Sequence, residues 1–157
     1  MTSDAARRID STATVHRAWA ADLDPRTLYE LMRLRVDVFV VEQECPYAEL
    51  DGRDLEDRAR HFWLAGGGRP PQVLGTLRLL KEPTGEYRIG RLCTAREARG
   101  RGLGKRLMEA VLAETGDRPS VLDSQEHLVD FYAGFGYRPT GEPYDWDGVP
   151  HVPMRRG

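Results

Sequence analysis

The sequence predicts a single-domain α/β fold in which a mixed β-sheet is flanked by helices. Two strong strand patterns, 73–81 and 86–94, are separated by the turn-forming segment 82–85, which together predict a β-hairpin. A glycine-rich turn and an amphipathic helix follow directly after the hairpin. No segment is repeated and no linker interrupts the 157 residues, a length that suits one domain.

The composition excludes several classes of protein. Hydrophobic residues make up 40% of the chain and charged residues 31%, as in ordinary globular domains, and the net charge of −2 gives no reason to expect nucleic acid as a partner. The apolar runs are too short for a membrane span, and the N-terminus lacks a signal-peptide core, so we expect a cytoplasmic protein. Cys45 and Cys93 lie far apart and predict free thiols, with no metal site.

The N-terminal part begins with polar residues. We expect residues 1–11 to be a disordered lead-in and residues 12–157 to form the domain. Alternating residues 14–20 predict the first strand. Asp24 followed by Pro25 is typical of a helix start, and apolar residues at spacings of three and four extend this helix to about Val41.

The segment from Glu42 to Arg60 differs from its surroundings because it carries seven carboxylates against three arginines. A Cys-Pro break and an Asp-Gly turn signal predict a loop with a short helical piece. The segment is either a solvated surface or an acidic cover over a site for a cationic substrate, because carboxylates around a cleft focus a negative potential. In the second interpretation, the residues expected to contact substrate are Glu42, Glu44 and Asp51.

The remaining elements complete the sheet. Residues 61–65 and 120–124 predict short strands, and a helix with an apolar stripe runs from Gln125 to Gly134. The tail, 144–154, has Asp147-Gly148 at its centre and predicts a closing hairpin. Its aromatic residues suit either the core or the edge of a homodimer.

The segment 89–112 reads as a strand, a glycine-rich turn and a helix. A helix N-terminus offers unpaired N–H groups and the positive end of the helix dipole, which favour a phosphate. Gly102 and Gly104 would let the backbone approach an anion closely, and basic residues surround them. Neither the Walker pattern nor the dinucleotide fingerprint fits. The turn therefore predicts a different phosphate-bearing ligand, unless it is only an exposed glycine turn.

The spacing Arg99-x-x-Gly102-x-Gly104 resembles the acyl-CoA signature of the GNAT acetyltransferase superfamily, in which the pyrophosphate of CoA rests on this turn. The resemblance covers almost the whole chain. Segments 34–47, 89–91, 127–132 and 148–151 are similar, more narrowly, to the ElaA-like branch. It implies splayed central strands and acetyl-CoA as co-substrate. One departure is Gln125, where Asn is commoner in the superfamily.

The resemblance also implies the site. Acetyl-CoA would donate its acetyl group to a primary amine of a small molecule or peptide, by direct transfer. Tyr132 matches the tyrosine that protonates the CoA thiolate, a general-acid role, although it also suits an apolar core stripe. The residues expected to bind the co-substrate, largely through backbone groups, are Leu92, Cys93, Thr94, Arg99, Gly100, Arg101, Gly102, Leu103, Gly104, Lys105 and Gln125.

The general base stays open at this point. The candidates are His61, His127, His151, Glu42, Glu44, Asp51 and Asp123. His61 is slightly favoured because its short strand would present it to the cleft. Cys93 is expected to be inert packing and not a nucleophile. The alternative function is a non-catalytic acyl-CoA sensor or scaffold of the same fold. The presence of both the glycine turn and Tyr132 favours an enzyme.

Overall fold

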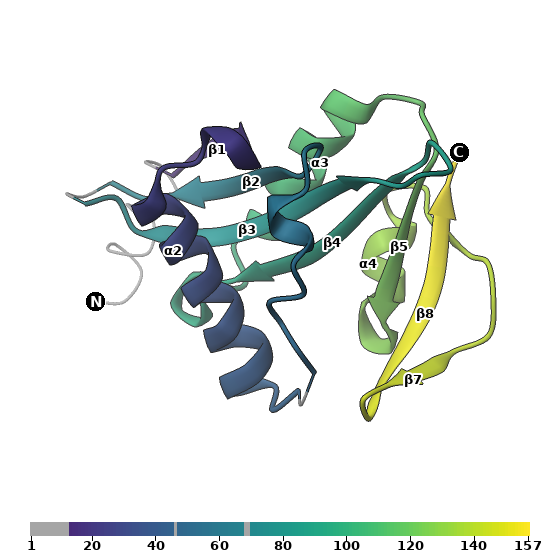
Figure 1. Cartoon of the computed structure of the whole chain (residues 1–157). Helices are drawn as coiled ribbons and strands as arrows, with labels where there is room; N and C mark the ends of the chain where they lie inside the picture. The colour runs from purple at the N-terminus through teal and green to yellow at the C-terminus, as the bar shows by residue number, and fades with distance from the viewer. Residues whose placement is uncertain (1–12, 46, 68–69) are drawn as a thin grey trace.

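The computed structural model describes residues 13–45, 47–67 and 70–157, so the expected lead-in, 1–11, lies outside the described residues. Eight strands of the described chain form one mixed sheet in the order β1-β2-β3-β4-β5-β8-β6, with β7 paired to β8 (Figure 1). Among these described strands, only β4 and β5 are parallel neighbours. The strands are β1 (Thr14–Trp19), β2 (Arg60–Ala65), β3 (Val73–Lys81), β4 (Tyr87–Thr94), β5 (Ser120–Gln125), β6 (Arg138–Pro139), β7 (Tyr144–Trp146) and β8 (Val149–Arg156).

Helices cover both faces of the sheet, with α2 (Pro25–Arg35) on one face and α3 (Leu103–Thr115) on the other (Figure 1). The carboxylate of Asp24 caps α2 by accepting the N–H of Thr27 at 2.8 Å, as the sequence predicts. From Val36 the helix continues as the π-helix η2 (Val36–Glu42). The short elements are α4 (Val129–Ala133), η1 (Ala20–Asp22), η3 (Arg53–Leu55), η4 (Arg96–Ala98) and η5 (Glu126–Leu128). None of the helices in the described ranges is long and apolar enough to cross a bilayer.

The central strands are splayed. β4 and β5 pair only at Tyr87–Ser120 and Arg88–Val121, and then diverge. β5 instead stays paired with β8 along its whole length. The sheet therefore opens into a V between β4 and β5, which confirms the mixed, splayed α/β architecture that the sequence predicts.

A β-bulge in β4 accompanies this divergence. Gly90 pairs with Arg78 and Cys93 pairs with Thr76, so Arg91 and Leu92 together oppose a single residue of β3. Arg91 adopts a left-handed φ of 54°, an uncommon conformation that costs a non-glycine residue about 1–3 kcal/mol. Bulges bend a strand and increase its twist, and this one lies in the stretch of β4 that is no longer paired with β5.

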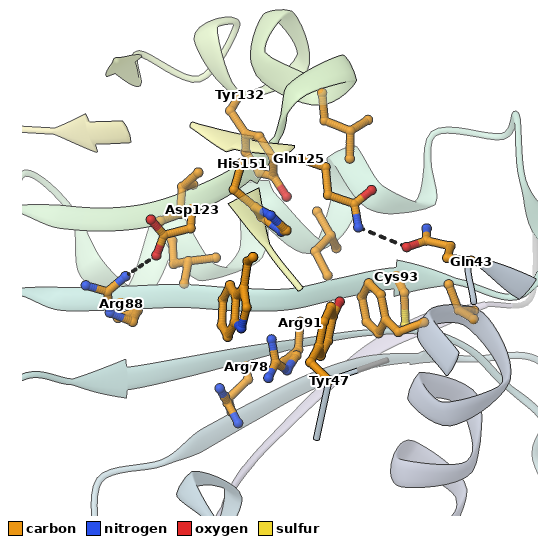
Figure 2. A pocket seen from close by; sticks show the side chains of 18 of the residues that line it. Gln43, Tyr47, Arg78, Arg88, Arg91, Cys93, Asp123, Gln125, Tyr132 and His151 are labelled. Carbon is orange, nitrogen blue, oxygen red and sulfur yellow. Dashed lines mark hydrogen bonds and ion pairs between the residues drawn. The ribbon is translucent and has the colours of Figure 1, made fainter. Parts of the chain in front are cut away.

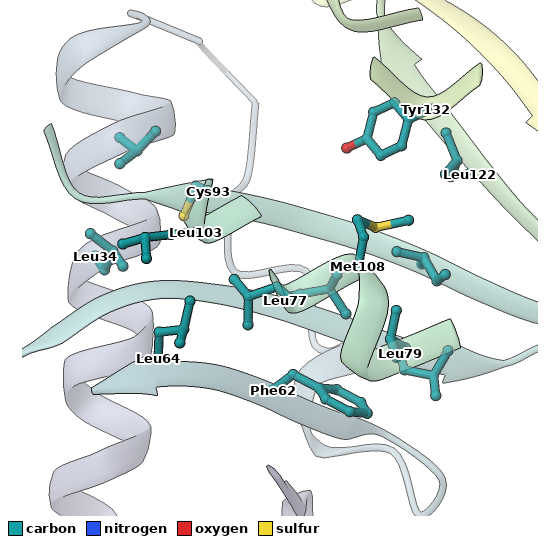
Figure 3. Close-up of a cluster of buried hydrophobic side chains, with 14 of the residues drawn as sticks. Leu34, Phe62, Leu64, Leu77, Leu79, Cys93, Leu103, Met108, Leu122 and Tyr132 are labelled. Atoms are coloured by element: carbon teal, nitrogen blue, oxygen red, sulfur yellow. The ribbon is translucent and has the colours of Figure 1, made fainter. Parts of the chain in front are cut away.

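The core gathers buried side chains of the sheet and of both α2 and α3. Leu77 and Leu79 of β3 pack with Met108 of α3, and Leu34 of α2 and Leu122 of β5 belong to the same cluster (Figure 3). These side chains are at most 9% exposed. The helix predicted over 125–134 begins as a 3-10 turn, and its α-helical part spans only Val129–Ala133.

Candidate functional site

The V between β4 and β5 holds a cavity of about 760 Å³, a volume typical of sites for small molecules. β3, β4, β5 and β8 contribute its lining, together with η2 and α4 (Figure 2). Seven of the residues that the sequence assigns to the site line this cavity: Asp51, Leu92, Cys93, Thr94, Arg99, Gln125 and Tyr132.

The glycine turn lies beside the cavity, at the N-terminus of α3. Gly102 is the residue before the helix and has a left-handed φ of 73°, with no atom within 4 Å of where a Cβ would stand. Gly102 makes no capping side-chain bond at this end of α3, so the first N–H groups of the helix can receive an anion. Leu103 is 2% exposed and points into the core, so it can offer a ligand only its backbone.

Of the basic residues in the turn, Arg99 lines the cavity. Its guanidinium pairs with Glu42 at 2.7 Å and donates to the carbonyl of Thr94 at 3.2 Å. Lys105 is exposed and lies 3.7 Å from Glu109, one turn further along α3. The turn thus combines a helix N-terminus with an arginine that is held against the end of β4.

Beyond Arg88, the edge of β4 that faces β5 pairs with no strand in the described ranges. Leu92, Cys93 and Thr94 line the cavity at this edge, where an extended ligand can pair with free backbone groups of β4 as an added strand would. The thiol of Cys93 is buried, and burial raises its pKa to about 12. Cys93 is therefore protonated at neutral pH and belongs to the same buried cluster as Leu103 (Figure 3).

Tyr132 enters the cavity from α4 (Figure 2). Its ring packs edge-on against Phe131 at 5.1 Å, and the residue is 8% exposed. The Tyr132 hydroxyl makes no hydrogen bond within the described part of the chain. Burial raises the pKa of the phenol above its usual value, so the hydroxyl keeps its proton at neutral pH. It can therefore act as a proton donor.

The acidic segment does not form an open negative surface. Buried Arg35 of α2 binds Glu49 at 2.8 Å and also pairs with Asp54, and Arg78 of β3 makes a two-pronged contact with Asp51 at 2.9 and 3.0 Å. Although burial opposes it, hydrogen bonds from Arg78 and from the Arg53 N–H lower the pKa of Asp51 to about 2. These carboxylates anchor the segment to the sheet.

The structure therefore corrects the expected acidic cover. Asp51 lines the cavity but is paired, Glu42 is bound to Arg99, and Glu44 is exposed outside the lining. Each carboxylate of the lining has an arginine within 3.4 Å, and the lining arginines outnumber the carboxylates by five to three. Every carboxylate in the lining is therefore paired with an arginine, and none is left unpaired to attract a cationic substrate. The lining carboxylates are Asp51, Glu82 and Asp123, and the arginines are Arg53, Arg78, Arg88, Arg91 and Arg99.

The expected placement of His61 is also wrong. Its ring is 1% exposed, lies outside the cavity lining, and places Nε2 3.0 Å from the carbonyl oxygen of Asp54. The reason is topological: β2 is separated from the cleft by β3 and β4. Burial lowers the pKa of His61. Its side chain packs beneath the acidic segment and does not face the cavity.

An aromatic wall is the feature that sequence reasoning missed. The rings of Tyr47 and Trp146 stack at 5.5 Å, and the guanidinium of Arg91 lies 5.7 Å from each ring centre. His151 of β8 lies beside Trp146 at 5.5 Å. A further contact joins the two sides of the V, since Gln125 donates to Gln43 at 2.9 Å (Figure 2). The Asp147-Gly148 turn indicates that Trp146 and His151 belong to one hairpin. No local pattern indicates that this hairpin contacts Tyr47.

Known proteins share this architecture. A family model described as an acetyltransferase (GNAT) domain matches residues 30–156. The UPF0039 protein Rv2851c of Mycobacterium tuberculosis is 53% identical over 92% of this chain and 94% of its own length. Protein ElaA of Escherichia coli is 37% identical over 87% of this chain and 91% of its own length. A crystal structure of an acyl-CoA N-acyltransferase from Pseudomonas aeruginosa superimposes with a TM-score of 0.84, at 40% identity, and covers 92% of this chain and 99% of that one.

Proposed function

Because the chain belongs to the GNAT acetyltransferase family, we propose that it transfers an acetyl group from acetyl-CoA directly to a primary amine of a small molecule or peptide. The observation that carries the proposal is the V-shaped cavity, which has the glycine turn beside it and the hydroxyl of Tyr132 in its wall. The two features suit the two ends of an acyl-CoA, its pyrophosphate and its thioester.

The glycine turn fits a pyrophosphate. The N–H groups at the start of α3 and the positive end of its dipole attract phosphate oxygens. The open space at Gly102 lets a phosphate approach the backbone closely. Arg99 adds a guanidinium at the point where β4 leads into the turn. The proposal includes further contacts to the pyrophosphate from the glycine turn and the start of α3. These are the predicted contacts at Gly100, Arg101, Gly104 and Lys105.

The free edge of β4 fits the pantetheine arm. Backbone groups of Leu92, Cys93 and Thr94 would pair with its amides, and a backbone N–H of this edge would face the thioester oxygen. A fixed donor at that point stabilises the negative charge that develops when an amine attacks, the largest single contribution in many acyl transfers. Gln125 lies across the opening, where its amide is already bonded to Gln43.

Tyr132 would donate its proton to the departing thiolate. Its hydroxyl is protonated at neutral pH and has no hydrogen-bond partner in the described chain, so no protein group competes for the proton. The high pKa of Cys93 disfavours a covalent acetyl-enzyme, because the thiolate is the nucleophilic form of cysteine. Direct attack of the amine is therefore the proposed route.

The competing function is an acyl-CoA sensor or scaffold without turnover. A thiol-release assay with acetyl-CoA and a panel of primary amines separates the two, with calorimetric titration of acetyl-CoA run in parallel. Thiol release that depends on an amine supports the enzyme. Tight binding of acetyl-CoA without release for any amine supports the sensor, and absence of binding contradicts both.

A further inference from the structure

His151 holds a single tautomer at the cavity. It lies on β8 directly opposite Gln125 of β5, and the residue is 5% exposed. Its Nδ1 atom is 2.8 Å from the carbonyl oxygen of Val149. A carbonyl oxygen only accepts hydrogen bonds, so Nδ1 carries the hydrogen. In the neutral ring, the lone pair is then on Nε2.

The Nε2 atom is open to the cavity. His151 is among the lining residues, and its ring projects from β8 into the space between β4 and β5 (Figure 2). Nε2 has no hydrogen-bond partner within the described ranges. It is also not one of the unpaired polar atoms that are fully buried, so some of its surface is accessible. It is therefore reached from the cavity, as a group that exchanges protons with a ligand must be.

Two aromatic rings hold the imidazole in this orientation. Tyr144 stacks on it at 6.0 Å with an interplanar angle of 29°, and Trp146 lies against it at 5.5 Å. With the bond to Val149, these contacts fix the ring from β7 and from its own strand. A histidine with a set tautomer and a set orientation has the features of a general base.

The other candidates for the base are less suitable. Asp51 has a pKa of about 2 and is therefore a weak base, and Asp123 is bonded to Arg88 at 2.8 Å. Glu42 is paired with Arg99, and His61 lies outside the cavity. Glu44 and His127 are exposed, and Glu44 does not line the cavity.

We propose that His151 is the general base of the acetyl transfer, an inference that rests on the proposed function. The amine nitrogen forms a bond to the thioester carbon while the carbon–sulfur bond breaks. Nε2 of His151 takes the proton that the amine nitrogen loses, and the thiolate takes the proton of the Tyr132 hydroxyl. The products are an amide and a thiol. His151 then returns its proton, through water, to Tyr132.

The test is the variant His151→Asn, because the asparagine amide can donate to Val149 as Nδ1–H does but offers no base. We expect kcat to fall by about 10²–10⁴, the usual contribution of a general base, while the affinity for acetyl-CoA by calorimetry stays within twofold. His16→Gln, a change at an exposed histidine of β1 outside the cavity lining, is the matched control and should keep kcat within threefold.

A second variant separates loss of the base from loss of folding. His151→Ala leaves space for a small base, and added imidazole should restore kcat at least tenfold. If His151→Asn keeps wild-type kcat, or if imidazole leaves His151→Ala unchanged while it still binds acetyl-CoA, His151 is not the base. Amine-dependent thiol release by the wild type in the same experiment keeps the proposed function intact, whereas its absence removes both.

Discussion

The rings of Tyr132 and Tyr137 meet edge to face at 6.3 Å, yet their hydroxyls have different surroundings. The hydroxyl of Tyr137 shares a buried hydrogen bond of 2.7 Å with Ser120, whereas that of Tyr132 reaches the cavity. Two neighbouring tyrosines thus offer a matched pair of substitutions, one that removes a proton donor and one that removes a structural bond.

Tyr132→Phe keeps the packed ring and removes the proposed proton donor. We expect kcat to fall on the order of 10²-fold, the lower range for general-acid catalysis, with little change in the melting temperature. Steady-state kinetics and thermal unfolding measure the two effects. Unchanged turnover together with a clear loss of stability would show that the hydroxyl of Tyr132 is structural.

Tyr137→Phe should give the opposite result. It leaves the hydroxyl of Ser120, which is fully buried, without its partner. Such a group costs about 1–3 kcal/mol of folding free energy. Chemical denaturation should show this loss, while kcat stays within threefold of the wild type because Tyr137 does not line the cavity. A large fall in kcat here would mean that packing, and not proton donation, explains both variants.

Gly102→Val tests the glycine turn. A valine side chain would occupy the space where the pyrophosphate is proposed to sit, and a β-branched residue disfavours the left-handed φ of 73°. We expect the dissociation constant for acetyl-CoA to rise at least tenfold, which is about 1.4 kcal/mol or more. Isothermal calorimetry measures the change.

The control is Gly116→Val, at the other end of α3. Gly116 has a positive φ of 61° with a ψ of −134°, a conformation that a valine adopts even less readily than the left-handed one of Gly102, and it has open space around its missing Cβ. The control therefore carries at least as much backbone strain as Gly102→Val. The 13-residue helix separates the two sites by about 20 Å. Acetyl-CoA affinity should be unchanged in this variant. Equal weakening in both variants would point to strain in α3 and remove the argument for a phosphate site.

Cys93→Ala tests direct transfer. With a thiol pKa of about 12, Cys93 holds almost no thiolate at neutral pH, so the variant should keep kcat within about threefold. Intact-protein mass spectrometry of the wild type with acetyl-CoA and no amine should show no acetyl adduct at this residue. An adduct that disappears when amine is added would establish a covalent intermediate in place of direct attack.

Much of the fold follows from local signals. Asp24 and Pro25 mark the start of α2, and the alternation in 73–81 and 86–94 predicts the β3–β4 hairpin. The glycine turn is equally local, because its residues are contiguous and its φ angles favour glycine at positions 100 and 102. Such features can be predicted from a single sequence because neighbouring residues determine them.

The missing parts depend on contacts between distant segments. Arg35 shares the helical spacing of a core stripe, but its burial against Glu49 and Asp54 arises only once the segment after α2 folds back. The bulge at Arg91 and Leu92 directly follows Gly90, but this single glycine does not determine which residue takes the left-handed φ, and the guanidinium of Arg91 lies 3.1 Å from Glu49, which is distant in the sequence. The cavity position of His151 depends on its register with Gln125, which no local pattern determines.

The ion pairs under the acidic segment make stability depend on pH. Because the folded-state pKa of Asp51 is about 2 and its ordinary value is 3.8, its contribution is present above pH 4 and is lost as pH falls through 2. The pKa of Asp54 is also lowered, because hydrogen bonds from Arg35 outweigh its burial, so its contribution has the same sign. Burial raises the pKa of Glu49, so proton uptake there favours the folded state and partly offsets the loss just above pH 4.

We therefore expect the melting temperature to be nearly constant from pH 7 to 5 and to fall steeply between about pH 4 and 2. Asp51→Asn should lower the melting temperature at pH 7, because it removes one partner of the Arg78 pair, and should flatten the acid slope. Asp57→Asn is the control, since Asp57 is exposed in the same segment and has no ion pair with any described residue. Circular dichroism across the pH series measures all three proteins. If the slopes of wild type and Asp51→Asn coincide, the acid sensitivity arises elsewhere and the Asp51–Arg78 pair does not hold the segment against the sheet.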